Sequence, residues 1–186
     1  MTPRVLRADG RRAVPWKNGG GTTRKVAVAP EGTGTDDFDW RISLADVGVD
    51  GPFSAFPGVE RILTVADGAG MELTVGGKRT VADQRYRPHA FPGDVPTEGR
   101  LLGGPVVNFN VMYRRDRIAC RTSVVRGEAA PAVPPGATVV VVALDGTTAV
   151  GDTGLTLGRY DAVLLDGPPG PLRTDGHAAV VALRRL

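Results

Sequence analysis

The stretch that decides the fold of this chain is residues 38–61, which read FDWRISLADVGVDGPFSAFPGVER. Apolar and polar side chains alternate from Trp40 to Val47, which is the pattern of a β-strand. The segment 50–58 is a turn rich in glycine and proline, residues that set the special backbone angles of turns. A turn does not need the arginines at 41 and 61 or the paired Phe53 and Phe56. They indicate a pocket for a small polar molecule.

Glycine is the exception in an otherwise ordinary composition: it supplies 26 of the 186 residues, about twice the usual share of roughly 7%. A further 15 prolines are dispersed between apolar runs. This combination predicts an all-β protein in which many turns join short strands. The glycines have no period of three, and the segments between them are rich in Val, Leu and Ile. A collagen-like or disordered chain is therefore excluded.

Alternating apolar and polar residues predict a series of short strands. We expect them at residues 24–29, 40–47, 61–66, 71–75, 78–82, 106–113, 117–125, 138–144, 147–150, 155–157, 160–165 and 178–183. Gly76-Gly77 is typical of a hairpin turn, and the Ala- and Pro-rich segment 127–136 is expected to be a connector. We therefore expect a single compact unit, 1–186, made of two β-barrel lobes at roughly 1–115 and 116–186 that share a core.

Charge and cysteine content exclude several classes of partner. The net charge is +3, but the arginines are dispersed and form no basic stripe, so we expect no nucleic-acid partner. The single cysteine, Cys120, allows no internal disulfide and is expected to be a buried thiol. No apolar run reaches the ~18 residues of a membrane span, and the N-terminus lacks a signal-peptide core. We expect no membrane partner and a cytoplasmic location.

Histidine content argues against a metal or any other cofactor. A metal site in a small β-barrel of this kind needs two or three histidines with a carboxylate. The chain has only His89 and His177, without a His-x-His pair, and we expect both in turns or on the surface. As an alternative, His89 could be a lone general base, which would need Asp94 or Tyr86 beside it.

Two further groups of residues could line a pocket. The segment 16–23, WKNGGGTT, fails the spacing of a phosphate-binding loop, and both a structural turn and a pocket wall remain open for it. Arg41 and Arg61 by themselves are typical of surface arginines. Arg41, however, shares a strand face with Ser43, and Asn108 shares one with Asn110. If these faces point into a barrel, they form a site for an anionic or amide-bearing molecule.

These segments resemble the HutD/Ves family of bacterial proteins, over residues 16–115 well and over the remainder loosely. The matching stretches are Trp16-x-Asn18-Gly19-Gly20-Gly21-Thr22-Thr23, Asp39-Trp40-Arg41-Ile42-Ser43-x-Ala45-Asp46, Asp50-Gly51-Pro52-Phe53-Ser54-x-Phe56-Pro57-Gly58, Arg61, Phe91-x-Gly93-Asp94, and Gly103-Gly104-Pro105 running to Asn108-Phe109-Asn110-Val111-Met112-x-Arg114-Arg115. One departure is Asn108, where the family commonly has Asp.

The resemblance implies an RmlC-like, two-lobed cupin barrel without metal, associated with histidine utilisation as a modulator or sensor. It implies an acidic or amide-bearing ligand such as N-formylglutamate or formiminoglutamate. With the residue patterns above, it selects as candidate ligand contacts Asn18, Arg41, Ser43, Ser54, Phe56, Arg61, Asn108 and Asn110.

Three functional classes remain open from the sequence. The first, which we favour, is a ligand-binding regulatory module. The second is a metal-free isomerase or hydrolase that acts on a similar molecule, for which His89, Asp46 and Asp94 are the available bases. The third is an interaction module without a polar cavity. The sequence does not determine the oligomeric state, and a homodimer stays open.

Overall fold

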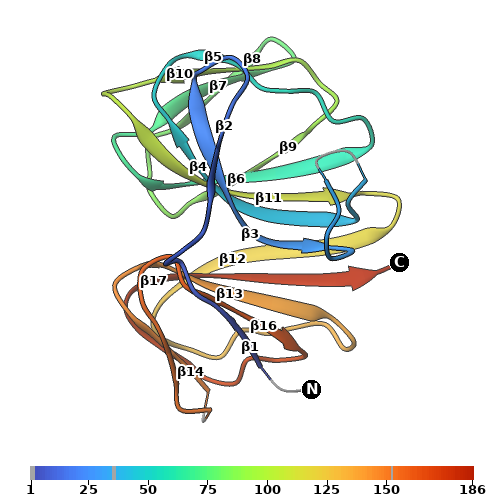
Figure 1. The fold of residues 1–186 in the computed structure, drawn as a ribbon, viewed down its shortest axis with the longest axis vertical. Coiled ribbons are helices and arrows are strands. Elements are labelled where there is room, and N and C mark those ends of the chain that lie inside the picture. Colours follow the sequence, from blue (N-terminus) through green and yellow to red (C-terminus); the bar gives the residue numbers. More distant parts are fainter. Residues whose placement is uncertain (1–2, 35–36, 152) are drawn as a thin grey trace. The chain divides into compact units, whose positions relative to one another are not determined.

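The computed structural model describes residues 3–34, 37–151 and 153–186. Strands, turns and loops account for these residues (Figure 1), which confirms the all-β prediction. The chain divides into two compact units: a large unit, Arg12–Arg117, and a small unit, Met1–Arg11 with Ile118–Leu186. The start of the chain was expected in the first lobe. It belongs instead with the C-terminal residues, because β1 (Arg4–Leu6) pairs with β16 (Ala162–Asp166).

The large unit contains two antiparallel sheets. The six-stranded sheet has the order β2-β3-β4-β11-β6-β9, and the four-stranded sheet has the order β5-β10-β7-β8. The strands are β2 (Ala13–Pro15), β3 (Gly21–Ala29), β4 (Trp40–Val47), β5 (Gly51–Pro52), β6 (Val59–Asp67), β7 (Met71–Val75), β8 (Lys78–Ala82), β9 (Pro88–Pro92), β10 (Thr97–Leu101) and β11 (Val106–Arg114).

A shared core defines which face of each sheet points inward. One cluster of buried side chains draws on both sheets: Ala45, Val47, Leu63, Val65, Met71, Leu73, Ala82, Phe91 and Val106. Successive side chains of a strand alternate between its two faces. Every second residue of β4, β6, β9 and β11, counted from a member of this cluster, therefore lies on what we call the inward face.

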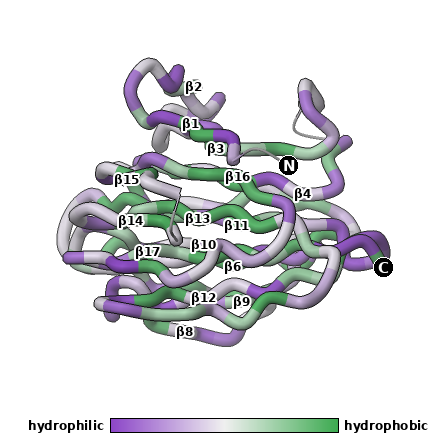
Figure 2. The backbone as a smooth tube through the Cα atoms, turned by 90° about the horizontal axis from the view of Figure 1, so that it is seen from below, coloured by the Kyte–Doolittle hydropathy of each residue, from purple (hydrophilic) through white to green (hydrophobic). Residues whose placement is uncertain are grey.

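The small unit is built on one seven-stranded sheet, in the order β1-β16-β13-β17-β14-β15 with β12 beside β17. Its remaining strands are β12 (Ile118–Ala129), β13 (Thr138–Asp145), β14 (Thr148–Val150), β15 (Leu155–Leu157) and β17 (Leu172–Arg185). The core cluster of this sheet consists of aliphatic side chains, and Figure 2 shows β13 as hydrophobic along most of its length.

The end of β12 differs from the sequence prediction. The connector expected at 127–136 begins later, because β12 continues to Ala129. The continuation needs a bulge between Arg126 and Gly127, and Gly127 takes a φ of 68°, which glycine adopts without strain.

Among the described residues, no helix is long and apolar enough to cross a membrane.

Candidate functional site

Two arginines lie on the inward face of the six-stranded sheet, in one row across three neighbouring strands. Arg41 on β4 and Arg61 on β6 both pair with Met112 of β11, and Arg61 also pairs with Phe91 of β9. Because residues directly opposite in an antiparallel pair point to the same side, these four side chains share the inward face. The alternation in the sequence had placed Arg41 on one strand face with Ser43, and the pairing of β4 with β11 agrees with that, whereas no direction was predicted for Arg61.

The next row on this face is polar. Asn110 pairs with Ser43 on one side and with Leu63 on the other, and Leu63 pairs with His89. The prediction that His89 lies in a turn or on the surface is therefore wrong. His89 belongs to β9 and lies on the inward face, half-buried, one row away from the arginines.

A third polar group lies deeper between the two sheets. Asn108 is 1% exposed, and its Nδ2 donates to the sulfur of Met71 across the core at 3.3 Å. Its Oδ1 has no hydrogen-bond partner, whereas its backbone carbonyl accepts from Nδ2 of Asn110 at 3.3 Å. Asn108 therefore presents a free acceptor where a family Asp would present a negative charge.

Arg61 is enclosed by three phenylalanine rings. Its guanidinium lies 4.7 Å from the ring centre of Phe53, 5.4 Å from that of Phe91 and 5.8 Å from that of Phe56. The carbonyl of Ser54 accepts a hydrogen bond from Nη1 at 3.2 Å. The turn 50–58 therefore contributes ring faces and a backbone oxygen, while the side chain of Ser54 is exposed. Phe53 and Phe56 are half-buried rather than buried, and each packs against the edge of a core cluster.

Arg61 differs from the other buried charges of the described residues. Asp39 accepts from Arg117 at 3.0 Å, and Asp161 accepts from Arg7 at 2.7 Å. Arg61, 8% exposed, has no carboxylate partner, and its Nε is buried without a hydrogen bond. A buried charge is costly unless it is paired. Burial accordingly lowers the pKa of Arg61 to about 10, a value at which it stays protonated at neutral pH.

Arg41 is in a similar, less enclosed position. It is half-buried, and its Nε also lacks a hydrogen-bond partner. Burial lowers the pKa of Arg41 from its ordinary value. Two cationic groups thus lie on one face without a carboxylate partner among the described residues.

The acidic residues considered as bases lie elsewhere. Asp46 is the residue after Ala45, so its side chain points away from the inward face. On that opposite face, Arg24 donates a hydrogen bond to the Asp46 carboxylate at 2.7 Å. Asp94 pairs with Arg115 and accepts from the backbone of Gly58. Neither carboxylate is placed to orient His89.

The glycine loop 16–23 is a structural turn. The side-chain oxygen of Asn18 accepts from the backbone of Gly20 at 3.1 Å, and the Asn18 side chain is exposed. A Cβ on Gly21 would lie 2.2 Å from the carbonyl oxygen of Asp46, so this glycine permits the close contact of β3 with β4. Of the two alternatives left open by the sequence, the turn describes Asn18 better than a pocket wall.

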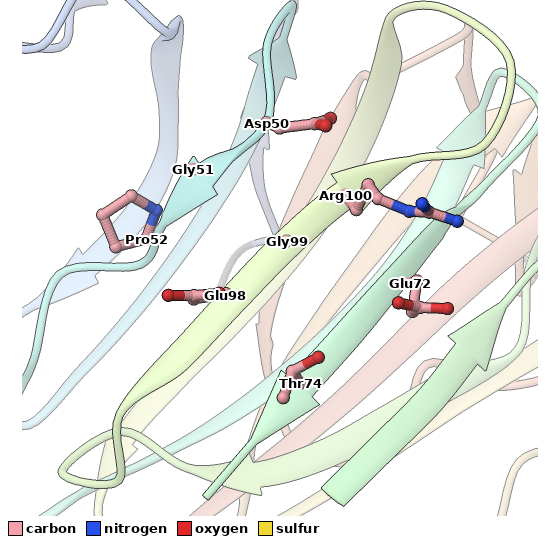
Figure 3. Close-up of a pocket in the computed structure, with 8 residues that line it drawn as sticks. All are labelled: Asp50, Gly51, Pro52, Glu72, Thr74, Glu98, Gly99 and Arg100. Carbon is pink, nitrogen blue, oxygen red and sulfur yellow. The ribbon is translucent and has the colours of Figure 1, made fainter. Parts of the chain in front are cut away.

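A hollow of about 350 Å³ lies on the other side of the four-stranded sheet, away from the two arginines. It is lined by Asp50, Gly51, Pro52, Glu72, Thr74, Glu98, Gly99 and Arg100. Figure 3 shows the charged side chains spread over the strands rather than converging on one point, and Arg79 already pairs with Glu72. Mixed, exposed charges of this kind are typical of a solvated sheet face.

Two other kinds of site were considered, a metal-ligand cluster and a reactive cysteine. The described residues contain no group of three or more His, Cys, Asp or Glu that could hold a metal ion. Burial raises the pKa of the Cys120 thiol to about 11. The thiol is therefore protonated at neutral pH and is a poor nucleophile.

Comparison with known proteins identifies relatives that match most of the chain. A Pseudomonas putida protein, described as an uncharacterized 21.2 kDa protein in the hutC 3' region, is 36% identical over 166 residues, 88% of this chain and 86% of the relative. The protein Ves of Cronobacter sakazakii is 37% identical over 110 residues, 59% of this chain and 58% of Ves.

Solved structures give the same result and extend it to the fold. The structure of HutD from Pseudomonas fluorescens SBW25, described as a formate condition, matches with a TM-score of 0.87 and 35% identity, and each chain is covered completely. A nickel-bound bacterial pirin from Escherichia coli has a TM-score of 0.62 at 9% identity, with 100% of this chain and 99% of the pirin covered. At that identity only the fold is shared. These neighbours confirm the predicted two-lobed cupin fold.

The family model of HutD matches residues 8–182. That span includes the whole large unit and nearly all of the small one, whereas the sequence resemblance was clear only for residues 16–115. The resemblance inferred from sequence motifs is confirmed and extended: this chain belongs to the HutD family.

Proposed function

We propose that this protein is a metal-free, ligand-binding module that recognises a small acidic metabolite on the inward face of the large unit. The observation that carries the proposal is the pair of buried or half-buried arginines, Arg41 and Arg61, without a carboxylate partner. If these two side chains served only to fill space in the core, apolar side chains at the same positions would make the fold more stable.

The spacing of the two arginines favours a ligand with two anionic groups. Arg41 and Arg61 are separated by one strand, so their backbones lie about 10 Å apart, twice the ~4.8 Å spacing of strands. Long guanidinium side chains from these positions reach either one carboxylate together or the two ends of a short dicarboxylate. Each arginine can hold a carboxylate through two parallel hydrogen bonds.

Neutral polar groups on the same face favour an amide in the ligand. Ser43 and Asn110 occupy the row beside the arginines, and Asn108 has an unused acceptor oxygen. An N–H of a formamide or formimino group would satisfy that acceptor. N-formylglutamate and formiminoglutamate combine this group with two carboxylates.

The relatives support an association with histidine utilisation. The P. putida relative is described by its place beside hutC, and the P. fluorescens structure belongs to HutD. We infer an association with histidine utilisation and a cytoplasmic location. Binding is favoured over catalysis because neither Asp46 nor Asp94 is placed to orient His89, the group on this face best suited to act as a base.

Thermal denaturation with a panel of ligands tests the proposal. N-formylglutamate at a hundredfold excess over its dissociation constant should stabilise the protein by about 2.7 kcal/mol, a shift of several degrees. Glutarate, which lacks the formamide, should give a smaller shift, and N-formylglycinamide, which lacks the carboxylates, a negligible one.

Two variants show whether the shift comes from this face. Arg41→Lys keeps the charge but loses the planar fork, so it should abolish most of the shift. Arg79→Lys, on the exposed strand β8, should leave it intact. If no acidic or amide-bearing metabolite of histidine breakdown shifts the wild-type protein, the interaction-module alternative replaces this proposal.

A further inference from the structure

We propose that His89 is a third cationic contact of this ligand site, and that it takes up a proton from solvent as the anion binds. This inference rests on the proposed function and deepens it, because it makes recognition depend on pH and on the number of negative charges that the ligand carries.

His89 lies close to Arg61 on the inward face. His89 pairs with Leu63 and Arg61 pairs with Phe91, so His89 and Arg61 are diagonal neighbours on the inward face. Such diagonal pairs lie about 7–8 Å apart at the backbone, within reach of long side chains that converge on one ligand. An anion held by Arg61 is therefore near the imidazole.

The imidazole has an unused nitrogen at this point. Nε2 of His89 is buried and has no hydrogen-bond partner. A protonated imidazole donates from both ring nitrogens and has no acceptor to spare. A carboxylate oxygen beside Nε2 would therefore satisfy the nitrogen and stabilise the charged ring at once.

Burial and the charges around His89 disfavour its protonated form while the site is empty. Burial lowers the pKa of His89, the positive charge of Arg87 lowers it further, and Asp83 raises it to a smaller extent. On the inward face the charged neighbours are Arg61 on β6 and, two strands further, Arg41 on β4. Tyr86, in the connection before β9, adds no negative charge at neutral pH.

Binding of an anion beside His89 favours the protonated imidazole. Because the pKa of His89 lies below its ordinary 6.5 in the empty site and an adjacent carboxylate raises it, binding consumes a proton at a pH between the two values. Affinity should therefore increase as the pH falls from 8 to 6 and level off below the pKa of the empty site, and a one-unit rise in the pKa limits the increase to about tenfold. The ligand carboxylates stay ionised over this range.

Calorimetry and NMR together test the inference with N-formylglutamate as the probe. Titrations at pH 6.5 in buffers of different ionisation enthalpy give the number of protons taken up, and the same titrations at pH 6 and pH 8 give the affinities. Because the chain has only two histidines, an NMR titration of the imidazole signals resolves both. We expect the signal of His89 to titrate below pH 6.5 without ligand and about one unit higher or more with it.

Variants of the two histidines supply the controls. His89→Gln keeps a hydrogen-bonding side chain without a titratable charge, so it should bind with an affinity that is the same at pH 6 and pH 8. His177→Gln changes the other histidine, which lies on β17 of the small unit beside Asp145, and should keep the wild-type pH dependence.

The outcomes separate the inference from the proposed function. Binding without proton uptake, or a His89 signal that is unmoved by ligand, overturns the role of His89 and leaves the arginine site standing. Absence of binding at both pH values overturns the proposed function itself.

Discussion

Replacement of Arg61 by methionine should leave the fold as stable as before while removing ligand binding. Burial lowers the pKa of Arg61 to about 10, which corresponds to about 3 kcal/mol against the charged form in the folded state. Arg61→Met removes that penalty. It also removes one charged hydrogen bond to Ser54, about 1.5–3 kcal/mol, and cation–π contacts of about 1–2 kcal/mol.

These terms nearly cancel. Methionine is flexible and apolar, so it can fill the space among Phe53, Phe56 and Phe91 with favourable sulfur–aromatic contacts. We therefore expect the free energy of unfolding to change by less than about 2 kcal/mol in either direction. A paired, structural buried arginine would instead cost about 3–5 kcal/mol when removed.

Urea denaturation, followed by tryptophan fluorescence, measures the free energy of unfolding of the unit that contains Arg61. Both tryptophans, Trp16 and Trp40, belong to the same unit as Arg61. Arg79→Met on the solvent side of β8 is the matched control, and it should retain the ligand-induced shift. A loss of more than 2 kcal/mol in Arg61→Met, with the ligand-induced shift preserved, would refute the view that Arg61 is kept for an external anion.

Three further predictions concern single positions. Gly21→Ala should destabilise the large unit by more than about 2 kcal/mol in urea denaturation, because its Cβ would meet the carbonyl of Asp46 at 2.2 Å; an unchanged midpoint would contradict the close approach. Asn108→Asp should weaken dianion binding at least tenfold by calorimetry, since a buried negative charge would face the ligand, and equal affinities would remove Asn108 from the site. Cys120, whose pKa burial raises to about 11, should react with a disulfide reagent at pH 8 far more slowly than in urea, and equal rates would show an accessible thiol.

The sequence predicted the strands that carry regular alternation. The expected strands at 40–47, 71–75 and 78–82 have the same bounds as β4, β7 and β8. In these segments apolar residues alternate with polar ones, so the period of two is visible in the sequence. The same alternation placed Arg41 and Ser43 on one face, as the pairing of β4 with β11 shows.

The strands that were missed are those without such a signal. Strand β9 begins and ends with proline, Pro88 and Pro92, and it lies at the edge of its sheet, where a missing backbone donor is tolerated. No strand was expected in this segment, and the expectation that His89 lies in a turn or on the surface was wrong. Likewise, β1 (Arg4–Leu6) is three residues long and finds its partner in β16, far along the chain. No local pattern could reveal that pairing.

The contrast between buried charges is the strongest argument that the inward face of the large unit has a function. Asp39 and Asp161 are buried with arginine partners, so their charges contribute to the fold. Arg61 is buried with three aromatic rings and one carbonyl, which do not neutralise it. In the small unit the core cluster consists of aliphatic side chains, and Asp161, the buried charge of that unit among the described residues, has an arginine partner. An unneutralised cation in the other core is best explained by an anion that arrives from outside.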